Sequence, residues 1–216
     1  MNYGEQINDI AQAAFSEYQT AEAGLTAAIK QREKYPDVLH KRSDHEYYAN
    51  VTRAEADYQT AKEAVKSAKN AFESRCNEVG QMRDNLKKDI DKLYGMTASE
   101  LDANEMELLK SGAMSPADFE RMLEVDIGIK NYTMVRMIGK HARDAANARF
   151  NKYGDRDDVG MKYWQVAMQC DRIDGSDLLK AFDLLSDLLR RCADNPAMIG
   201  YWDQLGGKAM QTLNRK

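Results

Sequence analysis

Residues 51–93 read VTRAEADYQTAKEAVKSAKNAFESRCNEVGQMRDNLKKDIDKL. Small and apolar side chains recur in this stretch at alternating spacings of three and four residues, the repeat that is typical of a coiled coil. The repeat is interrupted by two charged residues, Arg75 and Asp89. A second stripe with the same spacing precedes it, from Ile7 to Arg32. The two stripes predict two long helices, each with one face against a partner helix.

The segment between the two stripes predicts a turn. Pro36 disfavours a helix at the preceding residue and removes a backbone donor. Ser43 or Asp44 can then cap the start of the next helix. We therefore expect the two helices to form an antiparallel hairpin within one chain rather than a parallel dimer of either helix.

The hairpin also predicts a register, because dense packing sets large side chains against small ones. This places Tyr18 opposite Ala61 and Ile7 opposite Phe72. In that register the second helix extends beyond the first, and its apolar stripe continues without a partner in the hairpin. The stripe continues through five candidate interface residues: Val79, Met82, Leu86, Ile90 and Leu93. We expect them to meet either the C-terminal helices of the same chain or a protein partner, which includes a second copy in a homodimer.

The remaining residues carry shorter helix signals, and strand signals are sparse. Ser115-Pro116 is typical of a helix start, since serine caps the first turn and proline is tolerated in it. The expected buried face of that helix consists of Phe119, Met122, Leu123 and Ile127. The sequence thus predicts an all-α fold: a long antiparallel helical (coiled-coil) hairpin over residues 1–94, followed by a compact multi-helix bundle over residues 95–216.

Composition and charge exclude several classes of protein. The chain has 31 basic and 35 acidic residues, spread evenly on both sides of Tyr94, so neither part has the positive field of an obligate nucleic-acid binder. The N-terminal residues do not resemble a signal peptide, and no window is apolar enough to span a membrane. Three widely spaced cysteines indicate reduced thiols. We expect a cytoplasmic protein without membrane association.

A basic helix face is the second candidate surface. Arg136, Lys140 and Arg143 lie at i, i+4 and i+7, on one side of a helix predicted within residues 129–153. Such a face can contact a phosphate backbone, so weak nucleic-acid binding is the alternative function. The interpretation that we favour is a solvated face, or one that complements the acidic residues between Glu100 and Asp126.

No motif predicts catalysis, a cofactor or a metal. Gly139-Lys140 lacks the upstream glycines of a phosphate loop, and the chain has no HExxH sequence. The segment from Asp155 to Gly160 resembles a calcium loop, but valine stands at two of its ligand positions, Val159 and Val166. The cysteines form no CxxC pair. We therefore expect a protein that is not an enzyme.

The combination of an alanine-rich hairpin, a small helical bundle and no site motif resembles small helical assembly or accessory proteins, including those of bacteriophage and prophage modules. That resemblance is one of composition and pattern over the whole chain. It implies a non-enzymatic protein–protein interaction or assembly function, as a scaffold, an adaptor or an inhibitor.

Overall fold

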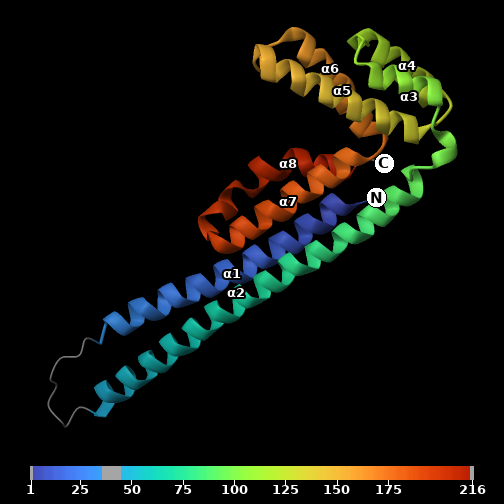
Figure 1. Cartoon of the computed structure of the whole chain (residues 1–216). Helices are drawn as coiled ribbons and strands as arrows, with labels where there is room; N and C mark the ends of the chain where they lie inside the picture. The colour runs from blue at the N-terminus through green and yellow to red at the C-terminus, as the bar shows by residue number, and fades with distance from the viewer. Residues whose placement is uncertain (1, 36–44, 215–216) are drawn as a thin grey trace. The chain divides into compact units, whose positions relative to one another are not determined.

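The computed structural model describes residues 2–35 and 45–214, and in these residues the fold is all-α (Figure 1). The predicted turn at Pro36 and the caps at Ser43 and Asp44 lie outside the described residues. The α-helices are α1 (Tyr3–Glu33), α2 (His45–Tyr94), α3 (Ala103–Ser111), α4 (Pro116–Gly128), α5 (Tyr132–Tyr153), α6 (Asp158–Ile173), α7 (Ser176–Asp194) and α8 (Trp202–Leu213). Two short 3-10 helices lie in the connections: η1 (Ala98–Glu100) between α2 and α3, and η2 (Pro196–Tyr201) between α7 and α8.

The chain forms two compact units. The first consists of residues 1–82 with 184–216, and the second of residues 83–183. This division differs from the predicted boundary at residue 94, because the last helices of the chain belong with the hairpin. Helices α2 and α7 each contribute to both units.

In the first unit, α1 and α2 form the predicted hairpin in a different register. The ring of Phe72 contacts Phe15, at a centroid distance of 5.7 Å, instead of lying opposite Ile7. The Nζ atom of Lys69 lies 6.0 Å from the ring centroid of Tyr18. The predicted register is therefore wrong by about two helical turns.

The end of α7 and all of α8 cover only part of this hairpin. Trp202 at the start of α8 is buried, its ring centroid lies 5.5 Å from that of Phe15, and its Nε1 donates a hydrogen bond to Oδ1 of Asn8 (3.0 Å). We call this part the inner half of the hairpin: α1 up to Phe15, and α2 from Phe72 to residue 82. Within the described residues, the outer half (16–33 and 51–71) has η2 and α8 beside it at its inner end, up to Ala23, and no further helix of the first unit beyond that (Figure 1).

In the second unit, α5 and α6 form a second antiparallel hairpin on which α4 packs. Gly139 brings the two helices close, since a Cβ atom there would lie 2.7 Å from the Cβ of Cys170. The core is apolar and nearly inaccessible to solvent. Its buried residues are Leu109, Phe119, Leu123, Met134, Val135, Ile138, Ala142, Val166, Ala167 and Cys170.

Helix α4 begins as predicted, with the Ser115 side chain and the Asp118 side chain each bonding the other residue's backbone N–H. Its buried face differs from the prediction at one position. Ile127 is 38% exposed, whereas Asp126 is 1% exposed and continues the stripe of Phe119 and Leu123. A carboxyl group therefore occupies an apolar position of this helix.

Candidate interaction surfaces

The predicted interface stripe on α2 is largely buried within the chain. Val79, Leu86 and Ile90 are at most 2% exposed, Met82 is half-buried, and Leu93 is 53% exposed. In the second unit, the turn between α6 and α7 packs here: a Cβ atom at Gly175 would lie 3.5 Å from Cγ1 of Ile90 and 3.2 Å from the ring of Tyr94. An interaction through this stripe would have to expose residues that the chain itself covers.

The predicted basic face on α5 is mostly engaged in ion pairs with buried acids. Nε of Arg136 donates to Asp174 (3.1 Å), and one NH2 nitrogen of Arg143 donates to both carboxylate oxygens of Asp171 (2.7 Å each). Lys140 between them is exposed. The two acids are 2% and 4% exposed, so the arginines compensate buried charges and hold α5 against the end of α6.

The sequence interpretation did not identify a groove in the outer half of the hairpin. This hairpin groove has a volume of about 560 Å³. Its lining consists of small residues and one glutamate: Ser16, Glu17, Thr20, Ala21 and Gly24 from α1, with Ala61, Ala64, Ser67, Ala68 and Ala71 from α2. Nothing in the described chain lies within 4 Å of the position that a Cβ atom of Gly24 would take. The floor is therefore shallow, apolar and open.

The hairpin groove continues from the place where α8 packs on α1. A neighbouring depression of about 410 Å³ is lined by Phe15 and Trp202, and it shares Ser16 and Thr20 with the hairpin groove. Arg75 and Glu17 form an ion pair between α2 and α1 at the inner end of the groove. The chain thus fills the inner part of this helix–helix surface with its own tryptophan and leaves the outer part open.

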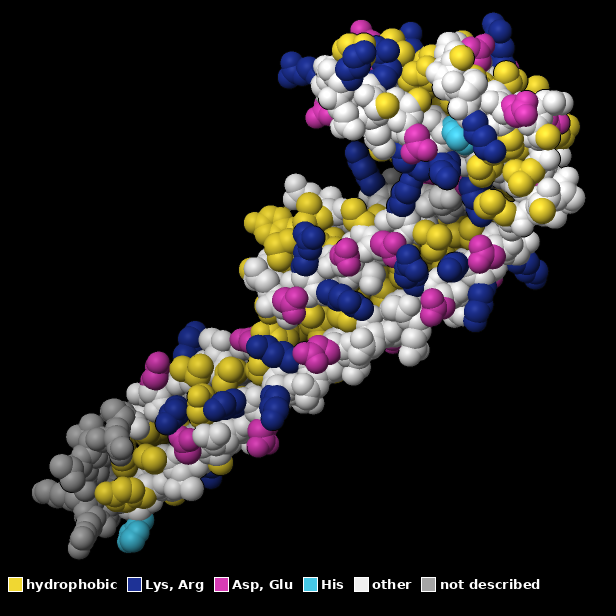
Figure 2. Space-filling model, in the orientation of Figure 1, with side chains coloured by type: hydrophobic (Ala, Val, Ile, Leu, Met, Phe, Trp, Pro, Cys, Tyr) yellow, Lys and Arg dark blue, Asp and Glu magenta, His cyan; other side chains and the backbone are white. Residues whose placement is uncertain are grey.

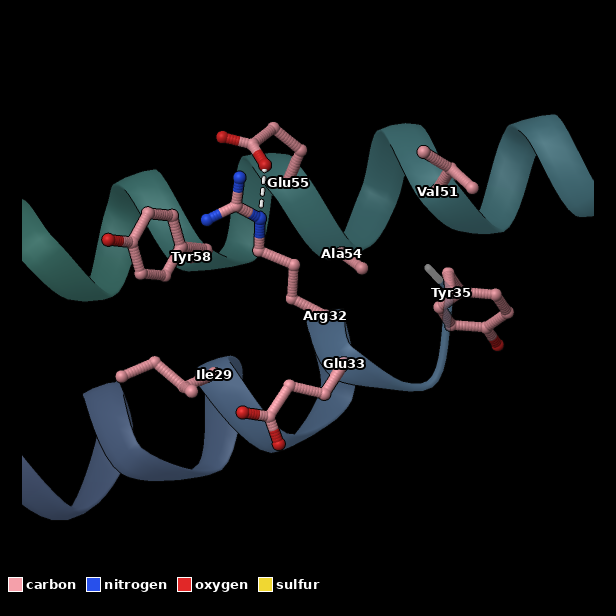
Figure 3. A pocket seen from close by; sticks show the side chains of 8 residues that line it. All are labelled: Ile29, Arg32, Glu33, Tyr35, Val51, Ala54, Glu55 and Tyr58. Atoms are coloured by element: carbon pink, nitrogen blue, oxygen red, sulfur yellow. Dashed lines mark ion pairs between the residues drawn. The ribbon is translucent and has the colours of Figure 1, made fainter. Parts of the chain in front are cut away.

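A second depression of about 560 Å³ lies at the far end of the outer half (Figure 3). Arg32 reaches from α1 toward α2, where its Nε lies 2.8 Å from Oε2 of Glu55 and its guanidinium lies 4.6 Å from the ring centroid of Tyr58. Ile29, 39% exposed, adds an apolar side chain. Figure 2 shows hydrophobic side chains between charged ones along the hairpin.

Sequence signals for these features exist in hindsight. We call the stripe of small and apolar residues by which α1 and α2 face each other the seam. The hairpin groove requires alanines beside the seam as well as in it, and Ala64 and Ala71 follow the seam positions Ala61 and Ala68 at a spacing of three. The acids that pair with the basic face come from α6 and the turn after it. They could not be assigned from spacing along the chain, because their proximity depends on how α5 and α6 fold back on each other.

No helix of the described residues is long and apolar enough to cross a membrane. The same residues contain no group of three or more histidine, cysteine, aspartate or glutamate side chains placed to hold a metal ion. Comparisons with protein-family models, curated proteins and solved structures found no match.

Proposed function

We propose that this chain is a non-enzymatic, cytoplasmic protein–protein interaction or assembly protein, and that it binds a helix of its partner in the hairpin groove. The observation that carries the proposal is the open groove of small residues directly beyond the site where Trp202 packs. The partner is another protein or a second copy of this chain, in an assembly or accessory role of the kind found in phage modules.

The contrast between the halves of the hairpin supports this. The inner half buries Phe15 and Phe72, with Trp202 against Phe15, whereas about every second seam position of the outer half is an alanine that buries little apolar area. Two helices with such a seam gain little from each other, since most helical stability in proteins comes from tertiary packing. A third helix on the outer half would supply the packing that α7 and α8 supply on the inner half.

The groove also indicates the chemistry of its occupant. Alanine, serine and glycine side chains allow a neighbouring backbone to approach closely, and they leave room for large apolar side chains. At the inner end, Trp202 packs its large ring against Phe15. We therefore expect a partner helix with large apolar or aromatic residues on one face and few charges on that face.

Photo-crosslinking tests the proposal. We would incorporate p-benzoylphenylalanine in place of Ser67, which is exposed in the groove, and in a matched variant in place of Lys66, which is exposed and outside the groove. We expect irradiation to give a discrete adduct from position 67 and little from position 66. An adduct of twice the chain mass in the purified protein identifies a second copy as the partner.

The control is an additional Gly24→Arg substitution, which places a long charged side chain in the groove at an exposed position where an added Cβ meets nothing within 4 Å. It should remove the adduct and leave the circular dichroism spectrum unchanged. Equal adducts from positions 66 and 67, or an adduct that survives Gly24→Arg, would contradict binding in the groove.

A further inference from the structure

Asp126 is a carboxyl group in an apolar environment. It follows Phe119 and Leu123 on the inward face of α4, is 1% exposed, and its Oδ2 has no hydrogen-bond partner among the described residues. It also lies in the last turn of α4, where the partial negative charge of the helix end disfavours an anion. Burial without a partner favours the neutral form of such a group.

The charged groups that act on Asp126 are both acids at the start of α3. Glu105 has a buried Oε2 that likewise lacks a partner within the described chain, and Asp102 is the N-cap of α3, accepting a hydrogen bond from the Glu105 backbone N–H at 2.9 Å. Burial, and then the charges of Glu105 and Asp102, raise the pKa of Asp126 to about 6. Burial, and then Asp102, also raise the pKa of Glu105.

The other helices that pack on α4 carry arginine side chains, and these form ion pairs with acids other than Asp126. On α5, Arg136 pairs with Asp174, Arg143 with Asp171, and Arg149 with Asp157 at 2.6 Å. Lys140 and Asp144 of α5 are exposed, as is Arg172 of α6, whereas His141 of α5 is half-buried and lines the same depression as Leu109 and Phe119. The charges that shift the pKa of Asp126 are those of Glu105 and Asp102, both in or next to α3.

Helix α3 has few apolar anchors of its own. Leu109 is its one fully buried residue, Met106 is partly buried, and Leu108 is 54% exposed. The helix ends at Gly112, which takes the left-handed conformation (φ 67°). Leu109 also lines a depression of about 510 Å³ together with Phe119 and Tyr163, so α3 forms one wall over this part of the core.

We propose that α3 is a pH-responsive flap: it docks on the core that α4 and α5 form while Asp126 is protonated, and ionisation of Asp126 against Glu105 and Asp102 releases it. Release exposes the apolar side chains beneath Leu109, including Phe119, and gives the second unit a surface that it lacks at acidic pH. This device is separate from the hairpin groove and does not depend on the proposed function.

Proton linkage determines whether docking of α3 becomes stronger or weaker as the pH rises. The pKa of Asp126 is about 6 with α3 docked, and for the released form, in which the proposal has the carboxyl hydrated, we take the ordinary aspartate value of 3.8. The docked form therefore binds more protons, and the stability of docking is fully present below about pH 4 and is lost as the pH rises through about 6. From these two values, the ratio of released to docked α3 increases about tenfold between pH 5 and pH 7.5.

Peptide-resolved hydrogen exchange at several pH values, corrected for intrinsic exchange rates, measures this ratio in the full chain. We expect protection of residues 103–111 to fall about tenfold between pH 5 and pH 7.5, while protection of α5 stays constant. Asp126→Asn should keep α3 protected throughout. Glu107→Gln, which removes an exposed charge from the same helix, should leave the wild-type pH dependence in place.

If Asp126→Asn does not fold, Glu105→Gln serves instead and should reduce the change in protection, because it removes the larger of the two repulsive charges on Asp126. Protection of α3 that is constant with pH in the wild type would overturn the proposal. A pH dependence that persists in both Asp126→Asn and Glu105→Gln would overturn it as well.

Discussion

The outer half of the α1–α2 hairpin and the α5–α6 hairpin are both pairs of antiparallel helices, but they are held together by different means. The α5–α6 pair has ion pairs along its length and a close approach at Gly139 against Cys170. The outer half has a seam of small residues and an open groove. The first pair is completed by specific contacts and by α4, which packs on it, whereas the second leaves a face available to a partner.

The two hairpins should differ most in the unfolding free energy that is lost when one apolar side chain of each is truncated to alanine. Ile138 of α5 is fully buried, so Ile138→Ala should lower the unfolding free energy of the second unit by about 2–5 kcal/mol, through lost transfer energy and a residual cavity. Leu25 of α1 is only partly buried, and Leu25→Ala should cost about 1 kcal/mol. Hydrogen exchange measured in increasing urea gives both values by peptide. Equal losses would refute the distinction between the two hairpins.

The hairpin itself could be predicted from the sequence, but its register could not. Moving α2 by one heptad relative to α1 again sets large residues against alanines, since the seam repeats every seven residues. Phe15, which lies outside the predicted stripe, contacts Phe72 and Trp202 and so distinguishes the observed register. Trp202 is far away in sequence, and no local pattern predicts that contact.

The candidate sites were limited by the same lack of information on tertiary contacts. Arg136 and Arg143 were correctly placed on one face of a helix, but their partners Asp174 and Asp171 resemble surface charges in the sequence. Asp126 lies three residues after Leu123, and helical periodicity alone could have placed it on the buried face. The sequence analysis predicts Ile127 there instead, and burial of the unpaired carboxyl group of Asp126 runs against the usual cost of burying a charged group.

The ion pairs of α5–α6 provide the next test. Arg143→Gln leaves Asp171 buried with Lys180 as its remaining ion-pair partner, and we expect it to lower the unfolding free energy of the second unit by about 1–3 kcal/mol. Lys140→Gln, on the same face but exposed, should change it by less than about 0.5 kcal/mol. A large effect of Lys140→Gln would mean that Lys140 has a structural or binding role that its exposure does not indicate.

Alanine at Gly139 tests the close approach in the α5–α6 pair. The added Cβ would meet the Cβ of Cys170 at 2.7 Å, so the helices would have to separate. The resulting strain should exceed the gain in helix propensity and destabilise the second unit by about 1–3 kcal/mol. Unchanged protection of α5 and α6 in hydrogen exchange would show that this contact is less tight than the geometry indicates.

A glycine-to-alanine substitution in the outer half should have the opposite effect on stability. Gly24 is exposed in the middle of α1, and an added Cβ meets nothing within 4 Å, so Gly24→Ala should stabilise α1 by about 0.5–1 kcal/mol through helix propensity. Yet that Cβ enters the hairpin groove, where a bound helix would lie. We therefore expect higher protection of α1 together with a weaker crosslink from position 67. If protection of α1 and the crosslink from position 67 both increased, the partner would not pack on the floor of the groove. A weaker crosslink beside higher protection supports packing there, because a more stable hairpin does not by itself reduce crosslinking.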